Sequence, residues 1–113
     1  MAARNKLQSA PPYQVEQGLK RLGANLRKAR LRRNLTIGDV ARKIGTGPRA
    51  IMDAEKGKPS TGIVVYMALL WVFDLLGQLD QVADPLTDKE GLALEAAKGR
   101  KRARKSGGLD NEF

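Results

Sequence analysis

Apolar side chains recur at three- and four-residue steps in the first third of the chain, which is the spacing of one helix face. The series comprises Leu19, Leu22, Leu26 and Ala29. Lysines and arginines occupy many of the positions between them, so the predicted helix is amphipathic. We expect it to begin near Tyr13, after a pair of prolines, and to end around Asn34.

Residues that mark the two ends of a second helix come directly after the first helix in the sequence. Thr36 is a good N-cap, and Asp39, three residues later, completes a pair of the capping-box kind. Gly45 supplies the left-handed residue that ends this helix. The inward face is formed by Val40, Ala41 and Ile44.

A third helix is predicted to start at Pro48, where a missing amide proton costs nothing, behind Gly47 as a weak cap. Its inward residues are Ile51, Ala54 and Glu55. Its outward residues are Arg49, Ala50, Met52 and Asp53. Gly57 and Pro59 then break the chain.

Residues 61–83 are apolar on more faces than one core can bury, so a second partner surface is expected. The pattern predicts a helix over residues 61–73 and a short one over residues 75–82. We interpret the surplus as a two-fold dimer interface formed by Val65, Leu69, Trp71, Val72, Phe73 and Leu76. The alternative is that the two helices enclose each other and the core, and the sequence does not decide the place of Trp71.

The pattern divides the chain into three parts. Residues 1–12 are polar and end in a proline pair, which predicts a flexible N-terminal arm. Residues 13–83 hold the predicted helices without strand-like alternation, so the expected fold is an all-α, five-helix bundle. Residues 84–113 form a C-terminal extension, in which residues 90–98 are expected to be helical and the basic tail after them disordered.

The net charge of +9 is unevenly distributed. Residues 1–60 carry fourteen Lys and Arg against four acids, residues 61–97 one against six, and residues 98–113 six against two. Two basic regions therefore flank an acidic, apolar middle. Such an excess fits a polyanion such as DNA or RNA, because each neutralised phosphate releases counterions. An anionic membrane and solubility alone are the alternatives.

The chain contains no Cys and no His, which excludes disulfides, thiolate nucleophiles, imidazole bases and nearly all zinc sites. No cofactor is expected, and an enzyme is the least favoured function because no nucleophile lies beside a base. Residues 1–12 lack the apolar segment of a secretory signal, and the apolar run of residues 63–76 is too short to cross a bilayer. A cytoplasmic protein without a membrane partner is therefore predicted.

One ordered set of residues is more specific than any of these patterns. It comprises Thr36, Ala41, Gly45, Ile51, Glu55 and Gly57. On these positions, residues 22–70 resemble the Cro/C1-type, or Xre-type, helix-turn-helix family. The resemblance implies a five-helix bundle that binds operator sites in double-stranded DNA as a homodimer.

The resemblance also implies roles for single residues. Arg30 and Glu55 match the positions of a partly buried ion pair between the first and third helices. The base-reading positions of the recognition helix are matched by Pro48, Arg49, Met52 and Asp53. Arg49 is the obvious base reader, through two hydrogen bonds to guanine, with a phosphate clamp as its alternative. For Asp53 the alternatives are a cytosine amine, solvent or a neighbour on the helix.

Phosphate contacts are expected at the start of the second helix and in the loop after the third. The candidates are Thr36, Arg42, Lys43, Lys56 and Lys58. The sequence departs from the family at Ile37 and Gly38, where Gln and an acid are common, so the backbone amides are left to bind phosphate there. In the C-terminal tail, Arg100, Arg102 and Arg104 are assigned to phosphate or minor-groove contacts, and a solubilising tail is the alternative.

The segment after the bundle, residues 80–105, resembles that of HipB-like antitoxins encoded beside HipA-type kinase toxins. This resemblance implies a repressor of its own operon that also binds a HipA-like kinase toxin, through the acidic and apolar residues 75–97. Two alternatives stay open. One is a stand-alone dimeric repressor without a toxin, and the other is a nucleoid-type protein that binds DNA with little sequence preference.

Overall fold

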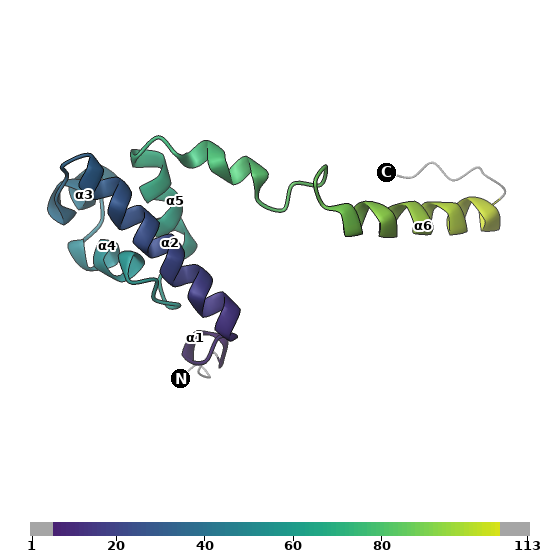
Figure 1. The fold of residues 1–113 in the computed structure, drawn as a ribbon, viewed down its shortest axis with the longest axis horizontal. Coiled ribbons are helices and arrows are strands. Elements are labelled where there is room, and N and C mark those ends of the chain that lie inside the picture. The colour runs from purple at the N-terminus through teal and green to yellow at the C-terminus, as the bar shows by residue number, and fades with distance from the viewer. Residues whose placement is uncertain (1–5, 107–113) are drawn as a thin grey trace. The chain divides into compact units, whose positions relative to one another are not determined.

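A computed structural model describes residues 6–106, with side chains through residue 100, and every regular element in that range is a helix (Figure 1). The elements are α1 (Lys6–Ser9), α2 (Tyr13–Arg32), α3 (Ile37–Ile44), α4 (Pro48–Glu55), α5 (Ile63–Val72), a 3-10 helix (Leu76–Gln81) and α6 (Lys89–Ser106). The all-α class predicted from the sequence is confirmed.

The contacts between residues divide the chain into two units, Met1–Gly77 and Gln78–Phe113. Helices α1 to α5 belong to the first unit and α6 belongs to the second. The 3-10 helix spans the boundary. The candidate recognition elements therefore all lie in the first unit.

The core of the first unit is built from α2, α3, α4 and α5. Helix α4 contacts α2, α3 and α5, and α3 also contacts α5. The largest fully buried side chains are Leu26, Val40, Ile51, Leu69 and Phe73. They come from all four helices, so each helix is fixed by burial of its own apolar face. Within the described residues, no helix has both the length and the apolar composition that crossing a bilayer requires.

The ends of α3 and α4 follow from local chemistry, as predicted. The Thr36 hydroxyl accepts a hydrogen bond from the Asp39 amide at 3.0 Å, and the Asp39 carboxylate accepts one from the Thr36 amide at 2.9 Å. Gly45 ends α3 with a left-handed φ of 89°. Helix α4 starts with Pro48, and Gly47 provides no side-chain cap. These signals set the length of the α3–α4 hairpin.

Two glycines allow close contact between α2 and α4. A Cβ on Gly23 would lie 2.5 Å from the carbonyl oxygen of Ala54 and 2.6 Å from that of Glu55. Gly57 has a φ of 69°, and a Cβ there would lie 2.5 Å from the Leu19 carbonyl oxygen. Both neighbours are backbone atoms, which cannot move aside as a side chain can. The short distance between α2 and the end of α4 therefore requires glycine, which has no Cβ, at both positions.

The structure differs from the sequence-based expectations in three places outside the core. The arm contains one helical turn, α1, before the prolines. The short helix expected over residues 75–82 is of the 3-10 type, and it contains Gly77, which disfavours an α-helix. Helix α6 extends past residue 98 to Ser106, so residues 99–106 are helical rather than disordered, while residues 107–113 lie outside the described range.

The greater length of α6 has a physical cause in its sequence. Asp88 accepts a hydrogen bond from the Gly91 amide at 3.0 Å and so caps the first turn. The helix itself is rich in Ala, Leu, Glu, Lys and Arg, the strongest helix formers. The charge run indicated disorder, but its residue types favour a helix.

Replacement of Gly23 by Ala is expected to lower the free energy of unfolding by about 1–3 kcal/mol, because the new methyl group meets two backbone carbonyls. Gly18→Ala, on the same helix, is the matched control. A Cβ at Gly18 meets nothing within 4 Å, so this variant should gain about 0.5–1 kcal/mol. Urea unfolding followed by circular dichroism measures both. Shifts of the same sign in the two variants would contradict the close contact.

Candidate nucleic-acid interface

Helices α3 and α4 form a tight hairpin joined by residues 45–47. The amides of Gly45 and Thr46 both donate to the Ala41 carbonyl, at 2.8 and 2.9 Å. Ala41 is buried, and its small side chain lets the two helices approach each other. The three-residue connection containing glycine is the one that a helix-turn-helix uses. The two hydrogen bonds thus close the turn between α3 and α4.

Helix α4 has one buried face and one open face. Ile51 and Ala54 are fully buried. On the other side Pro48, Arg49 and Met52 are exposed. The open face holds three of the four positions assigned to base reading from the sequence, Asp53 being half-buried, and Arg49 gives it a cation that no described side chain neutralises.

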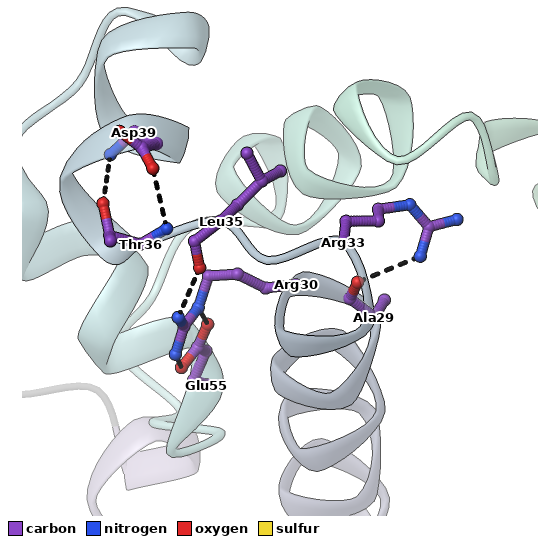
Figure 2. A network of polar contacts seen from close by, with 7 residues as sticks. All are labelled: Ala29, Arg30, Arg33, Leu35, Thr36, Asp39 and Glu55. Atoms are coloured by element: carbon purple, nitrogen blue, oxygen red, sulfur yellow. Dashed lines mark hydrogen bonds and ion pairs between the residues drawn. The ribbon is translucent and has the colours of Figure 1, made fainter.

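The expected ion pair between Arg30 and Glu55 is present and links α2 to the end of α4 (Figure 2). Arg30 Nε lies 2.6 Å from Oε2 of Glu55, and Nη2 lies 3.0 Å from Oε1. The remaining nitrogen, Nη1, donates to the Leu35 carbonyl at 2.9 Å. The two side chains are only 8% and 7% exposed. The hydrogen bond to Glu55 raises the pKa of Arg30, so the guanidinium group is held in its charged form.

Two of the candidates for phosphate contact at α3, Thr36 and Arg42, are engaged by Asp39. The Asp39 carboxylate, besides capping α3, pairs with Arg42 at 2.7 Å. Hydrogen bonds from Thr36, together with Arg42, lower the pKa of Asp39. Arg42 and Lys43 are both exposed, on the last turn of α3. Cations therefore line this helix while its capping carboxylate stays ionised.

Beyond α4, the structure brings two predicted DNA contacts together. The Lys58 amine lies 3.3 Å from Oδ1 of Asp53. The partner of Asp53 thus lies beyond the end of α4 and not on the helix itself, and Asp53 is half-buried. Lys56 is exposed, and no ion pair holds its amine within the described part of the chain.

The predicted dimer interface needs a correction. Leu69 and Phe73 are 0% and 2% exposed, so their side chains pack inside the first unit and cannot contact a second copy. Trp71 is 60% exposed, Leu76 is exposed, and Val65 and Val72 are half-buried. The sequence missed three exposed apolar residues of α5, namely Ile63, Val64 and Met67. These residues and Trp71 are three or four positions apart, which is the spacing of one helix face, and this spacing could have identified them from the sequence.

We call the exposed residues Ile63, Val64, Met67 and Trp71 the α5 stripe. In the second unit, Arg100 is exposed on α6. Arg102 and Arg104 lie in the same helix, but their side chains fall outside the described residues. Of the three arginines assigned to DNA contacts in the tail, only Arg100 thus has a described side chain.

Sequence reasoning gave no role to Arg27, which the structure places at the edge of the α4 face. A hollow of about 260 Å³ is lined there by Arg27, Arg30, Ile37, Met52, Glu55 and Lys56. Arg27 lies three residues before Arg30 on α2, so helical periodicity alone puts both on one side of the helix. That spacing was the signal that could have identified it.

Loss of one partner from the Arg30–Glu55 pair is expected to be costly, because it leaves a nearly buried charge alone. Glu55→Ala should lower the free energy of unfolding by roughly 3–5 kcal/mol. The double variant Arg30→Met with Glu55→Met is the control, and it should lose much less because no charge is stranded. Urea unfolding measures both. A double variant that is as unstable as Glu55→Ala would contradict this explanation.

Among the described residues, no group of three or more acidic side chains is placed to hold a metal ion. No family model matches the chain, and neither does a curated protein or a solved structure. The hairpin, the open face of α4 and the cations around it are therefore the grounds for a proposal about function.

Proposed function

We propose that the chain is a Cro/C1-type helix-turn-helix protein that binds double-stranded DNA with α4 in the major groove. The observation that carries this proposal is the open face of α4, which presents Arg49 and Met52 from a hairpin fixed by the Arg30–Glu55 pair. An α-helix with its side chains is about 10–12 Å across, which suits the major groove of about 12 Å, and the eight residues of α4 are exposed on the side that would face the bases.

The contacts divide into base reading and positioning. Arg49 reads a guanine through two hydrogen bonds, and Met52 offers an apolar contact to a neighbouring base. The first amides of α3, which are followed by Arg42 and Lys43, bind a backbone phosphate. Lys56 and Lys58 contact the DNA backbone beyond α4. Phosphate contacts at both ends of the hairpin thus position the protein on the duplex, and contacts from α4 to the bases give the preference for a DNA sequence.

The protein acts as a homodimer through the α5 stripe. An exposed apolar row on one helix is self-complementary across a two-fold axis, because each copy presents the same surface to the other. Trp71, at 60% exposure, is the largest side chain in the row and anchors it. Such a dimer binds two half-sites about 34 Å apart, one helical turn of DNA.

We assign the biological role from residues 80–105, which resemble the corresponding segment of HipB-like antitoxins. Exposed apolar side chains occur there between acids, at Val82, Leu86, Leu92 and Leu94. This composition suits a protein partner, and we assign it to a HipA-like kinase toxin encoded beside the repressor. Co-purification with the product of the adjacent reading frame separates this role from that of a stand-alone repressor.

Binding should be selective, and Arg49 should carry part of the selectivity. In gel shifts at about 150 mM salt, we expect tighter binding to the DNA upstream of the gene than to random duplex of equal length. Arg49→Ala should weaken specific binding by about 1–3 kcal/mol per half-site and leave binding to random DNA nearly unchanged. Equal losses on both duplexes would contradict base reading, and equal wild-type binding would favour a nucleoid-type protein.

Trp71→Lys is expected to give a monomer, because it places a charge in the middle of the α5 stripe. Sedimentation velocity should then report the mass of one 12.3 kDa chain, against twice that mass for the wild type. Tyr13→Lys is the matched control, since Tyr13 is an exposed aromatic residue on α2. A dimer that survives Trp71→Lys, or one that Tyr13→Lys also disrupts, would count against the α5 stripe.

A further inference from the structure

The hollow beside α4 connects three helices at the edge of the proposed DNA surface. Met52 lines it from the open face of α4, Ile37 from the first turn of α3, and Arg27 from α2. A duplex that meets Met52 and the start of α3 therefore passes over this hollow. Helix α2 is the one element among the three that the proposed contacts do not yet use.

The charge of the hollow is positive at its rim. Three cations and one carboxylate line it, so its formal net charge is +2. The carboxylate is that of Glu55, and it is engaged by two nitrogens of Arg30. Arg27 and Lys56 are exposed, and neither has an ion pair with another described side chain. Two uncompensated cations thus flank a pair that is already neutral.

The apolar side chain of Ile37 explains why these cations matter here. Ile37 is the first residue of α3 and cannot donate a hydrogen bond to a phosphate from its side chain. Donors near this point must come from backbone amides or from neighbouring helices. Arg27 has five N–H donors and stands on a helix that the Arg30–Glu55 pair fixes to α4. The position of its backbone relative to α4 is therefore set before any ligand arrives.

We propose that Arg27 and Lys56 together bind one phosphate of the DNA backbone over this hollow, which makes α2 a third DNA-contacting helix. This inference rests on the proposed function and adds a contact site to it. The contact is to the backbone, so it raises affinity for every duplex and carries no base preference. It also takes over the side-chain contribution that Ile37 does not supply.

The test is the salt dependence of binding by the full-length protein. Anisotropy titrations on the upstream duplex and on a random duplex, from about 50 to 200 mM salt, give the slope of log K against log salt. Arg27→Gln should reduce the slope on both duplexes by up to about 0.9 per protomer, the full value applying where Lys56 alone does not hold the phosphate. The affinity should fall by the same factor on both. Thermal unfolding should be unchanged, because Arg27 makes no described polar contact and Gln is also a good helix former.

Arg21→Gln is the matched control. Arg21 is exposed on the same helix, six residues earlier and thus about 120° around it, and it does not line the hollow. This variant has the same charge change and should leave the slope nearly unchanged. Equal effects of Arg21→Gln and Arg27→Gln would mean that only net charge matters, and would overturn the proposal.

The double variant Arg27→Gln with Lys56→Gln tests whether the two side chains share a phosphate. A shared phosphate predicts a total loss of about 0.9 in the slope per protomer, whereas two separate contacts predict about 1.8. The larger value would overturn the shared site.

The outcome for Arg49→Ala keeps this inference distinct from the function on which it rests. If Arg27→Gln leaves the slope intact while Arg49→Ala still removes selectivity, the phosphate site fails and the proposed function stands. If Arg27→Gln lowers the slope on both duplexes while Arg49→Ala leaves selectivity intact, the base-reading assignment fails and the phosphate site stands.

Discussion

The ion pair between Arg30 and Glu55 is the contact on which the rest of the first unit depends. It joins the long helix α2 to the last residue of α4, and its third nitrogen holds the Leu35 carbonyl in the connection to α3. Three segments of backbone thus meet at one guanidinium group. Because the pair is nearly buried, water competes with it weakly, and its hydrogen bonds are directional as well as strong.

Helix α4 needs this support because it is too short to be stable alone. An isolated helix of eight residues is marginal in water, so α4 owes its order to the surfaces around it. Gly23 and Gly57 bring the backbones of α2 and α4 close together. At the far end of α2, Arg33 stacks over the Phe73 ring at 5.3 Å and donates to the Phe73 carbonyl, which ties α2 to the end of α5. The backbone of α4 is therefore held by the helices around it, although the helix is short.

The sequence predicted the features that depend on local chemistry. Thr36, Gly45 and Pro48 mark helix ends through caps that involve neighbouring residues only, and the structure has helix ends at each of them. The buried face of α5 was not predicted correctly, because apolar residues surround that helix and periodicity then gives no direction. Leu69 was assigned to the surface for this reason. Arg27 was missed because its hollow exists only where three helices meet.

The two carboxylates beside the proposed interface have a consequence for how such a protein would search DNA. Asp39 partly neutralises Arg42, and Asp53 partly neutralises Lys58, so each cation must exchange an internal partner for a phosphate. That exchange lowers the net gain from any single phosphate contact, on every sequence alike. Under the proposed function, residence on the wrong duplex would become shorter, whereas a site that also satisfies Arg49 would retain its additional hydrogen bonds. Internal acids would thus speed the release of the protein from non-target DNA.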